Sequence, residues 1–139
     1  MDLQRLVDTF EFLNNWEDRY QLLIDLGEDL PPFPEEERTE DNRVEGCTSN
    51  VWLVSETGEE QPPRLHFQAD GDAFIVKGLV AILMKTYSGK TAQEILELCI
   101  EGLFERLGLG QQLTPNRHDG FVAMVKQIRA RAQATAAQA

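Results

Sequence analysis

The stretch "SNVWLVSETGEEQPPRLHFQAD", residues 49–70, decides the fold of this chain. Two β-type runs, 49–56 and 63–70, flank a polar segment that contains Gly58 and Pro62, and Pro63 follows at once. This pattern is typical of a β-hairpin with a rather long loop. A shorter run, "NRV" at 42–44, is a candidate third strand that leads into a turn at Gly46 and Cys47.

Amphipathic helices are expected on the N-terminal side of this hairpin. Apolar residues recur at helical spacing along 3–13 and along 16–24, and Asn15 is placed to cap the second helix. The prolines of "PPFP", residues 31–34, then exclude a regular helix. The acidic run 35–41 is expected to form an exposed loop or a single turn.

Three further helices are expected after the hairpin. The first lies between Asp72, placed as its N-cap, and Gly89 just past its end. The second opens with the capping box "TAQE", residues 91–94, and runs through Leu107. The last begins with Pro115 at its first helical position. The sequence thus predicts an α+β domain, a small antiparallel β-sheet of about three strands packed with N-terminal and C-terminal α-helices.

Length and composition favour a single domain over residues 1–139, with a frayed Ala/Gln tail at about 133–139. No apolar run approaches the roughly 18 residues that span a bilayer, so a membrane protein is not expected. The N-terminal segment has charges throughout and lacks the apolar centre of a secretory signal. Two cysteines in such a chain do not indicate a disulfide framework, and we expect a cytoplasmic protein.

The charge balance narrows the choice of partners. The chain has 13 basic and 24 acidic residues, which gives a net charge of −11. Nucleic-acid binding is therefore not expected, because it requires a basic surface. A partner with a basic patch is compatible with this charge.

The two cysteines are predicted to differ. Cys99 is in helical register with Ile95 and Leu103, so we expect it to be a packed apolar residue. Cys47 instead follows Gly46, which tolerates unusual backbone angles, and precedes two hydroxyl residues at a polar turn. Because an exposed thiol is usually kept for its chemistry, Cys47 is the candidate reactive residue.

Spacing argues against several familiar cysteine chemistries at Cys47. Asn50 occupies the position where a thioredoxin-type motif has its second thiol. Two cysteines with His66 and His118 are a poor ligand set for structural zinc or an iron–sulfur cluster. A hydrolase that pairs Cys47 with one of these histidines stays open. So does a single thiol that accepts a group and passes it on.

Arg117 is a second candidate site residue. It falls near the third position of the last helix, where the positive end of the helix dipole disfavours a cation. Asp119 or another acid could offset this effect. Alternatively, Arg117 is directed at an anion such as a thiolate or a partner's carboxylate, and the sequence leaves both interpretations open.

Three motifs resemble the SufE family of sulfur acceptors, which includes the related CsdE proteins: "EGCTSNVWLV" at 45–54, "ADGDAFIVKGLVAIL" at 69–83 and "LGLGQQLTPNRHDGF" at 107–121. The likeness extends from residue 14 to the final helix. It implies that Cys47 accepts sulfur and that Asp72 and Arg117 lie near the site or its partner surface. One departure is the pair His118 and Asp119, where the family commonly has a small residue and an amide.

The resemblance implies a mechanism for Cys47. As a thiolate it would attack a persulfide on a cysteine desulfurase, stimulate that enzyme, and pass the sulfur to an iron–sulfur scaffold protein. Pyridoxal phosphate would belong to the partner, so no cofactor is expected on this chain. When idle, the turn could shelter the thiol near Trp52 and slow its oxidation.

Two alternatives stay open from the sequence. The chain could be an acidic module that regulates a desulfurase allosterically, with Cys47 incidental. It could also be an independent thiol enzyme. The identity of the desulfurase, the recipient of the sulfur and the choice between monomer and homodimer are not decided by the sequence.

Overall fold

The computed structural model describes residues 3–46, 50–109 and 115–138, with the side chains of 115–117 and 138 excepted. A three-stranded antiparallel sheet has the order β1-β2-β3, formed by β1 (Val51–Thr57), β2 (Arg64–Gly71) and β3 (Lys90–Thr91). The predicted hairpin is thus confirmed. The third strand is β3 and not the predicted run 42–44, where Arg43 forms only an isolated bridge with Trp52.

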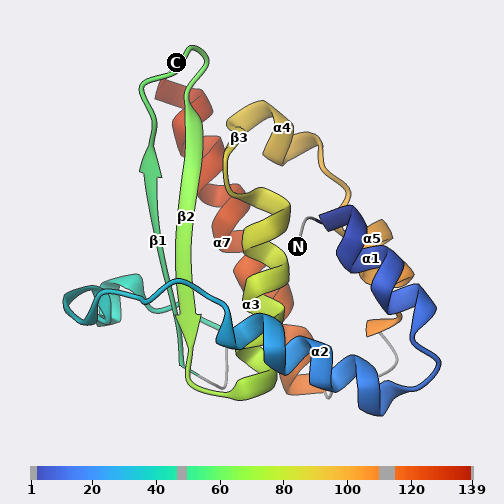
Figure 1. Ribbon diagram of the computed structural model, residues 1–139. Coiled ribbons are helices and arrows are strands. Elements are labelled where there is room, and N and C mark those ends of the chain that lie inside the picture. The colour runs from blue at the N-terminus through green and yellow to red at the C-terminus, as the bar shows by residue number, and fades with distance from the viewer. Residues whose placement is uncertain (1–2, 47–49, 110–114, 139) are drawn as a thin grey trace.

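Six α-helices are described around this sheet, which confirms the α+β fold class (Figure 1). They are α1 (Leu3–Phe12), α2 (Trp16–Glu28), α3 (Phe74–Tyr87), α4 (Ala92–Glu97), α5 (Ile100–Arg106) and α7 (Pro115–Gln138), and two 3-10 turns, η1 (Glu35–Glu37) and η2 (Glu40–Asn42), precede β1. Helix α3 is central: it packs against α2, β2, α7 and α1. No helix within the described ranges is both long and apolar enough to cross a membrane.

The core depends on a close approach between α2 and α3. A Cβ atom at Gly78 would lie 2.3 Å from the backbone oxygen of Leu23. This separation is far below van der Waals contact, so only glycine fits here. The next turn of α3 is fully covered, with Ile82 and Leu83 at 0% exposure. The glycine therefore sets how deeply α3 sits between α2 and the sheet.

Two of the predicted helix caps are confirmed and one is wrong. Asn15 accepts a hydrogen bond from the backbone N–H of Asp18 at 2.9 Å. Thr91 and Glu94 form the reciprocal capping box. Asp72 does not cap α3, because the N-cap is Ala73 and has no side-chain hydrogen bond. The carboxylate of Asp72 instead accepts a hydrogen bond from the side-chain amide of Asn50.

The predicted continuous helix from 91 to 107 is wrong, and so is the burial of Cys99. Helix α4 ends at Glu97, Leu98 and Cys99 are extended, and α5 begins at Ile100. This break shifts the helical register, so that Ile100 becomes buried and Cys99 is exposed. Arg129 of α7 donates to the backbone oxygen of Leu96 at 3.2 Å and satisfies one carbonyl group at the break.

The C-terminal part of α7 is attached to the sheet. Helix α7 continues past Ala132, which is 0% exposed, to Gln138. Arg131 attaches this part of the helix to β1: its guanidinium donates to Ser55 Oγ and to the backbone oxygen of Leu53, both at 3.0 Å. These bonds give the tail a tertiary anchor, which the sequence pattern did not indicate.

Candidate functional site at the base of the Cys47 segment

The segment 45–50 begins and ends at one point of the sheet. The backbone N–H of Val44 donates to the oxygen of Val51 at 2.8 Å, and Arg43 bridges to Trp52. Cys47 belongs to this segment but lies outside the described residues. The site is therefore defined by the residues on either side of it.

Asn50 connects the end of this segment to the start of α3. Its amide nitrogen donates to Asp72 Oδ2 at 3.0 Å, and its amide oxygen accepts from Arg43 Nε at 3.1 Å. The backbone N–H of Asp72 in turn donates to the Asn50 backbone oxygen at 3.2 Å. Sequence reasoning missed this role of Asn50. Its only local signal is an amide directly before a strand, whereas its partner Asp72 is 22 positions away.

Two glycines allow the chain to pass close to its neighbours at this site. Gly46 has φ of +93°, and a Cβ there would lie 3.1 Å from the Cβ of Ala123 on α7. Gly46 thus uses the conformational freedom that glycine allows at this position. Gly71 ends β2 where a Cβ would lie 2.9 Å from Val76 Cγ1. A hollow of about 540 Å³ lies between Glu45, Gly46 and one face of α7.

Trp52 is half-buried and is stacked with a cation. The guanidinium of Arg38 lies 4.9 Å from the Trp52 ring centroid and 5.4 Å from that of Phe33. Arg38 also forms an ion pair with Asp70, which is 7% exposed and pairs with Trp52 across the β1–β2 ladder. The hydrogen bond to Asp70 is the main reason why the pKa of Arg38 is raised. The cluster attaches the acidic turn η1 to the sheet.

The remaining predicted residues lie at the same end of the molecule. Figure 1 shows the start of β1, the end of β2 and the first turns of α3 and α7 together at its lower end. Arg117 lies in the first turn of α7, but its side chain is outside the described part of the structure. The His118 and Asp119 pair follows it, with Nδ1 and Oδ1 3.7 Å apart.

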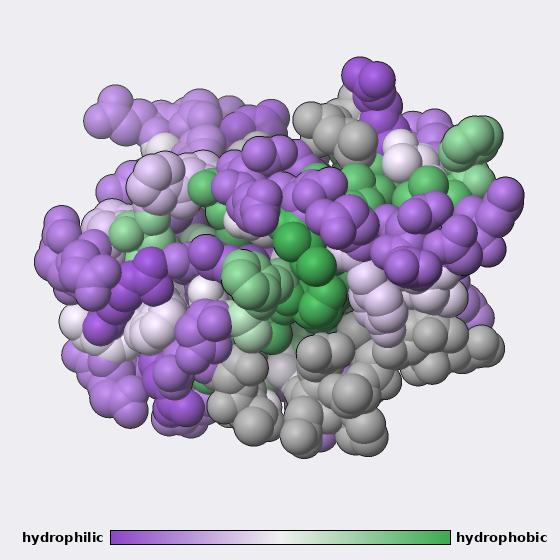
Figure 2. All heavy atoms as spheres, turned by 60° about the horizontal axis from the view of Figure 1, so that its bottom comes forward, coloured by the Kyte–Doolittle hydropathy of each residue, from purple (hydrophilic) through white to green (hydrophobic). Residues whose placement is uncertain are grey.

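This end of the molecule also has an exposed apolar residue. Figure 2 shows apolar atoms gathered in the middle of a largely hydrophilic face. Phe74, the first residue of α3, is 69% exposed and follows Asp72 by two positions. Within the described ranges no group of three or more His, Cys, Asp or Glu side chains is arranged to hold a metal ion.

Comparison with solved structures supports the fold. The solution structure of a hypothetical protein from Thermus thermophilus matches with a TM-score of 0.76, covering 97% of this chain and 96% of the other. The two sequences are 22% identical, so this likeness concerns the fold alone.

Sequence comparison shows the family. The model of the SufE domain, described as Fe-S metabolism associated, matches residues 4–132. An uncharacterised SufE-like protein of Rhizobium etli is 48% identical over 97% of this chain and 92% of its own length. A second one, from Rhizobium meliloti, is 43% identical over 94% of each chain. The chain belongs to the SufE family, and it is thereby associated with iron–sulfur metabolism.

Proposed function

We propose that this protein accepts sulfur on Cys47 from a pyridoxal-phosphate-dependent cysteine desulfurase and relays it to iron–sulfur cluster assembly. Membership of the SufE family supports this function, because that domain is associated with iron–sulfur metabolism. The proposal places the pyridoxal cofactor on the desulfurase and no cofactor on this chain. The expected setting is the cytoplasm, with an iron–sulfur scaffold protein as the recipient.

The transfer step is a thiol–disulfide-type exchange. The Cys47 thiolate attacks the outer sulfur of the persulfide on the desulfurase, and a new S–S bond forms on Cys47. The S–S bond of the desulfurase breaks at the same time, and its cysteine leaves as a thiolate. No external oxidant or reductant is needed, because the transferred sulfur atom is already at the oxidation level of a persulfide.

The observation that carries the proposal is the closed base of segment 45–50. The hydrogen bond from Val44 to Val51 and the hydrogen bond from Asn50 to Asp72 hold both ends of the segment at one end of the sheet, where β1 starts and β2 ends. Covalent continuity ties Cys47 to Gly46, which borders the hollow beside α7. A partner that reaches this end of the molecule therefore meets Gly46 and Asn50, the described residues on either side of the proposed acceptor.

The decisive experiment follows sulfur by mass. The protein is incubated with its cysteine desulfurase and free cysteine, digested without reductant, and the two cysteine-containing peptides are weighed. We expect the peptide that contains Cys47 to gain the mass of one sulfur atom in the wild type and in the Cys99→Ser variant. The corresponding peptide of the Cys47→Ser variant should gain none. Since Cys99 is exposed, the Cys99→Ser control is essential. Sulfur on the Cys99 peptide alone would contradict the assignment.

The same samples separate the rival functions. If the chain were an allosteric module, the Cys47→Ser variant would stimulate the desulfurase as well as the wild type does, and no peptide would gain the mass of a sulfur atom. An independent thiol enzyme would turn over a substrate without any desulfurase. His66 is poorly placed to serve such an enzyme, because it pairs with Glu56, five rungs along the ladder from Val51 and about 17 Å away.

Arg117 and Asp72 are proposed to assist docking or transfer. For Arg117→Ala we expect slower sulfur transfer with an unchanged urea denaturation midpoint, since the residue lies in the first turn of α7 beside the site. Sulfur transfer at the wild-type rate in Arg117→Ala would exclude a role of Arg117 in docking or transfer.

A further inference from the structure

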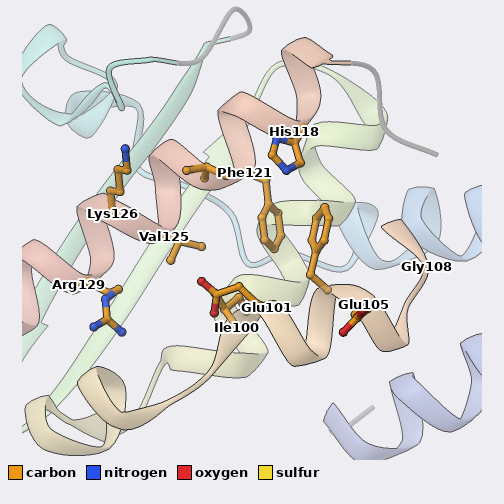
Figure 3. Close-up of a pocket in the computed structure, with 11 residues that line it drawn as sticks. Ile100, Glu101, Glu105, Gly108, His118, Phe121, Val125, Lys126 and Arg129 are labelled. Atoms are coloured by element: carbon orange, nitrogen blue, oxygen red, sulfur yellow. The ribbon is translucent and has the colours of Figure 1, made fainter. Parts of the chain in front are cut away.

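A groove of about 670 Å³ lies between α5 and α7 (Figure 3), and neither Asn50 nor Asp72 lines it. Figure 3 shows Phe121 of α7 directed into the space between the two helices, with Val125 further along the same face. The ring of Phe104 from α5 meets the Phe121 ring with centroids 4.9 Å apart. An apolar floor thus connects two helices that belong to different parts of the chain.

The outer part of this floor is accessible from solvent, above Phe121 and Val125, which are only 6% and 8% exposed. Phe104 is half-buried, and Val122 is 37% exposed, one of three large apolar residues exposed within the described ranges. The Phe104 ring also meets His118 edge-on, with centroids 5.6 Å apart, at one end of the groove. Apolar surface that is open in this way favours an apolar occupant, since its burial removes it from water.

The two walls of the groove have opposite charge. Helix α5 contributes Glu101 and Glu105, which are both exposed, whereas α7 contributes Lys126 and Arg129 (Figure 3). Arg129 is held in place by its hydrogen bond to the Leu96 oxygen. An occupant that complements this groove therefore has cationic groups along one side and anionic groups along the other.

The length of the groove matches a helix. The lining residues of α7 run at helical spacing from His118 to Arg129, which lies eleven residues further along the helix. At about 1.5 Å per residue this is roughly 16 Å, or three turns of helix. The charged groups flank the floor along this length and do not converge on one point, as they do in most sites for small molecules.

We propose that the groove between α5 and α7 binds an amphipathic helix of a partner protein, with its apolar face on Phe104 and Val122. A basic flank of that helix lies along α5 and an acidic flank lies along α7. This is the helix-in-groove mode of recognition, in which residues spaced by three or four positions act as anchors. The site does not depend on sulfur transfer at Cys47. Val122 and Lys126 also line the hollow beside Gly46, so the bound helix would lie next to the Cys47 segment.

The test uses three fluorescent synthetic helical peptides that share one leucine-rich apolar face. One has a lysine flank and a glutamate flank, the second has lysine on both flanks, and the third has glutamate on both. Fluorescence anisotropy with the full chain should give a dissociation constant at least tenfold lower for the mixed peptide. No binding of the mixed peptide at about 1 mM, or equal binding of all three, would overturn the proposal.

Variants locate the binding. Val122→Asp should raise the dissociation constant of the mixed peptide at least tenfold. Ala130→Asp adds the same charge to α7 outside the groove and should leave this constant unchanged. The double variant Glu101→Lys/Glu105→Lys should reverse the preference toward the all-glutamate peptide, which a merely destabilised protein would not do. Unchanged binding in Val122→Asp, or binding of an apolar dye such as anilinonaphthalene sulfonate without any peptide binding, would also overturn it.

Discussion

The amide of Asn50 donates a hydrogen bond of 3.0 Å to the carboxylate of Asp72. This bond joins the end of the Cys47 segment to the residue that precedes the N-cap of α3. Because Asn50 also accepts from Arg43, one amide group connects both ends of the segment with the central helix. The geometry at the candidate site therefore depends on a contact between two residues that are remote in sequence.

We predict that Asn50→Asp slows sulfur transfer severalfold, because two carboxylates then face each other across the former hydrogen bond. Exchanging the pair as Asn50→Asp/Asp72→Asn should restore transfer, since the amide then donates from position 72 and the carboxylate still accepts from Arg43. Both rates are measured with the desulfurase present, and the denaturation midpoints show whether the fold is intact. A double variant as slow as the single one would exclude a role for this bond.

Gly78 should not tolerate a side chain. We expect Gly78→Ala to lower the free energy of unfolding by about 3 kcal/mol, because the new Cβ would overlap the Leu23 backbone. Gly102→Ala in α5 is the matched control: its Cβ would meet only Cys99 Sγ at 3.9 Å. That control should gain about 0.5–1 kcal/mol from the better helix propensity of alanine. Urea denaturation compares the two, and equal midpoints would contradict the packing described for α2 and α3.

Arg131 should contribute to stability through its two bonds to β1. Removal in Arg131→Ala leaves the backbone oxygen of Leu53 without this donor, and we expect a loss of about 1–3 kcal/mol. Gln133→Ala, an exposed change two residues further along α7, serves as the control. Hydrogen exchange should also become faster at residues 133–138 in Arg131→Ala only. Equal exchange in both variants would show that the tail does not need this anchor.

Glu94 gives the fold a dependence on pH. Hydrogen bonds from Thr91, chiefly from its backbone N–H, lower the pKa of Glu94 below its ordinary value of 4.5. The folded state therefore favours the ionised carboxylate, and this stabilisation is complete above the unfolded-state pKa. It is lost as the pH falls through the lower pKa of the folded state. We expect the stability advantage of wild type over Glu94→Gln to be constant near neutral pH and to shrink below pH 4.5. A difference that does not change with pH would exclude the ionised cap.

The features that the sequence predicted correctly are local ones. The hairpin, the Asn15 cap and the capping box at Thr91 each depend on residues within a few positions of one another. The break before α5 was not predictable, because Ile95, Cys99 and Leu103 also fit one continuous helix. Arg129, which donates a hydrogen bond to the carbonyl group of Leu96 at this break, is 33 positions away in the sequence.

The candidate site was predictable only in part, for the same reason. Gly46 was chosen from its position in a turn, and the structure gives it a positive φ. Asn50 was missed because its function lies in a contact with Asp72 that only the folded sheet creates. Strand β3 has two residues and forms through pairing with β2, so no alternation in its own sequence could indicate it.

The stacking of Arg38 on Trp52 gives the molecule an optical reporter of its own. The chain has two tryptophans, and Trp16 lies on α2 beneath Arg19. The tryptophan emission of a Trp16→Phe protein would therefore come from Trp52 alone, which lies in β1 two positions after Asn50. Its fluorescence would report in real time, without any attached dye, whether the proposed desulfurase partner docks at this end of the sheet.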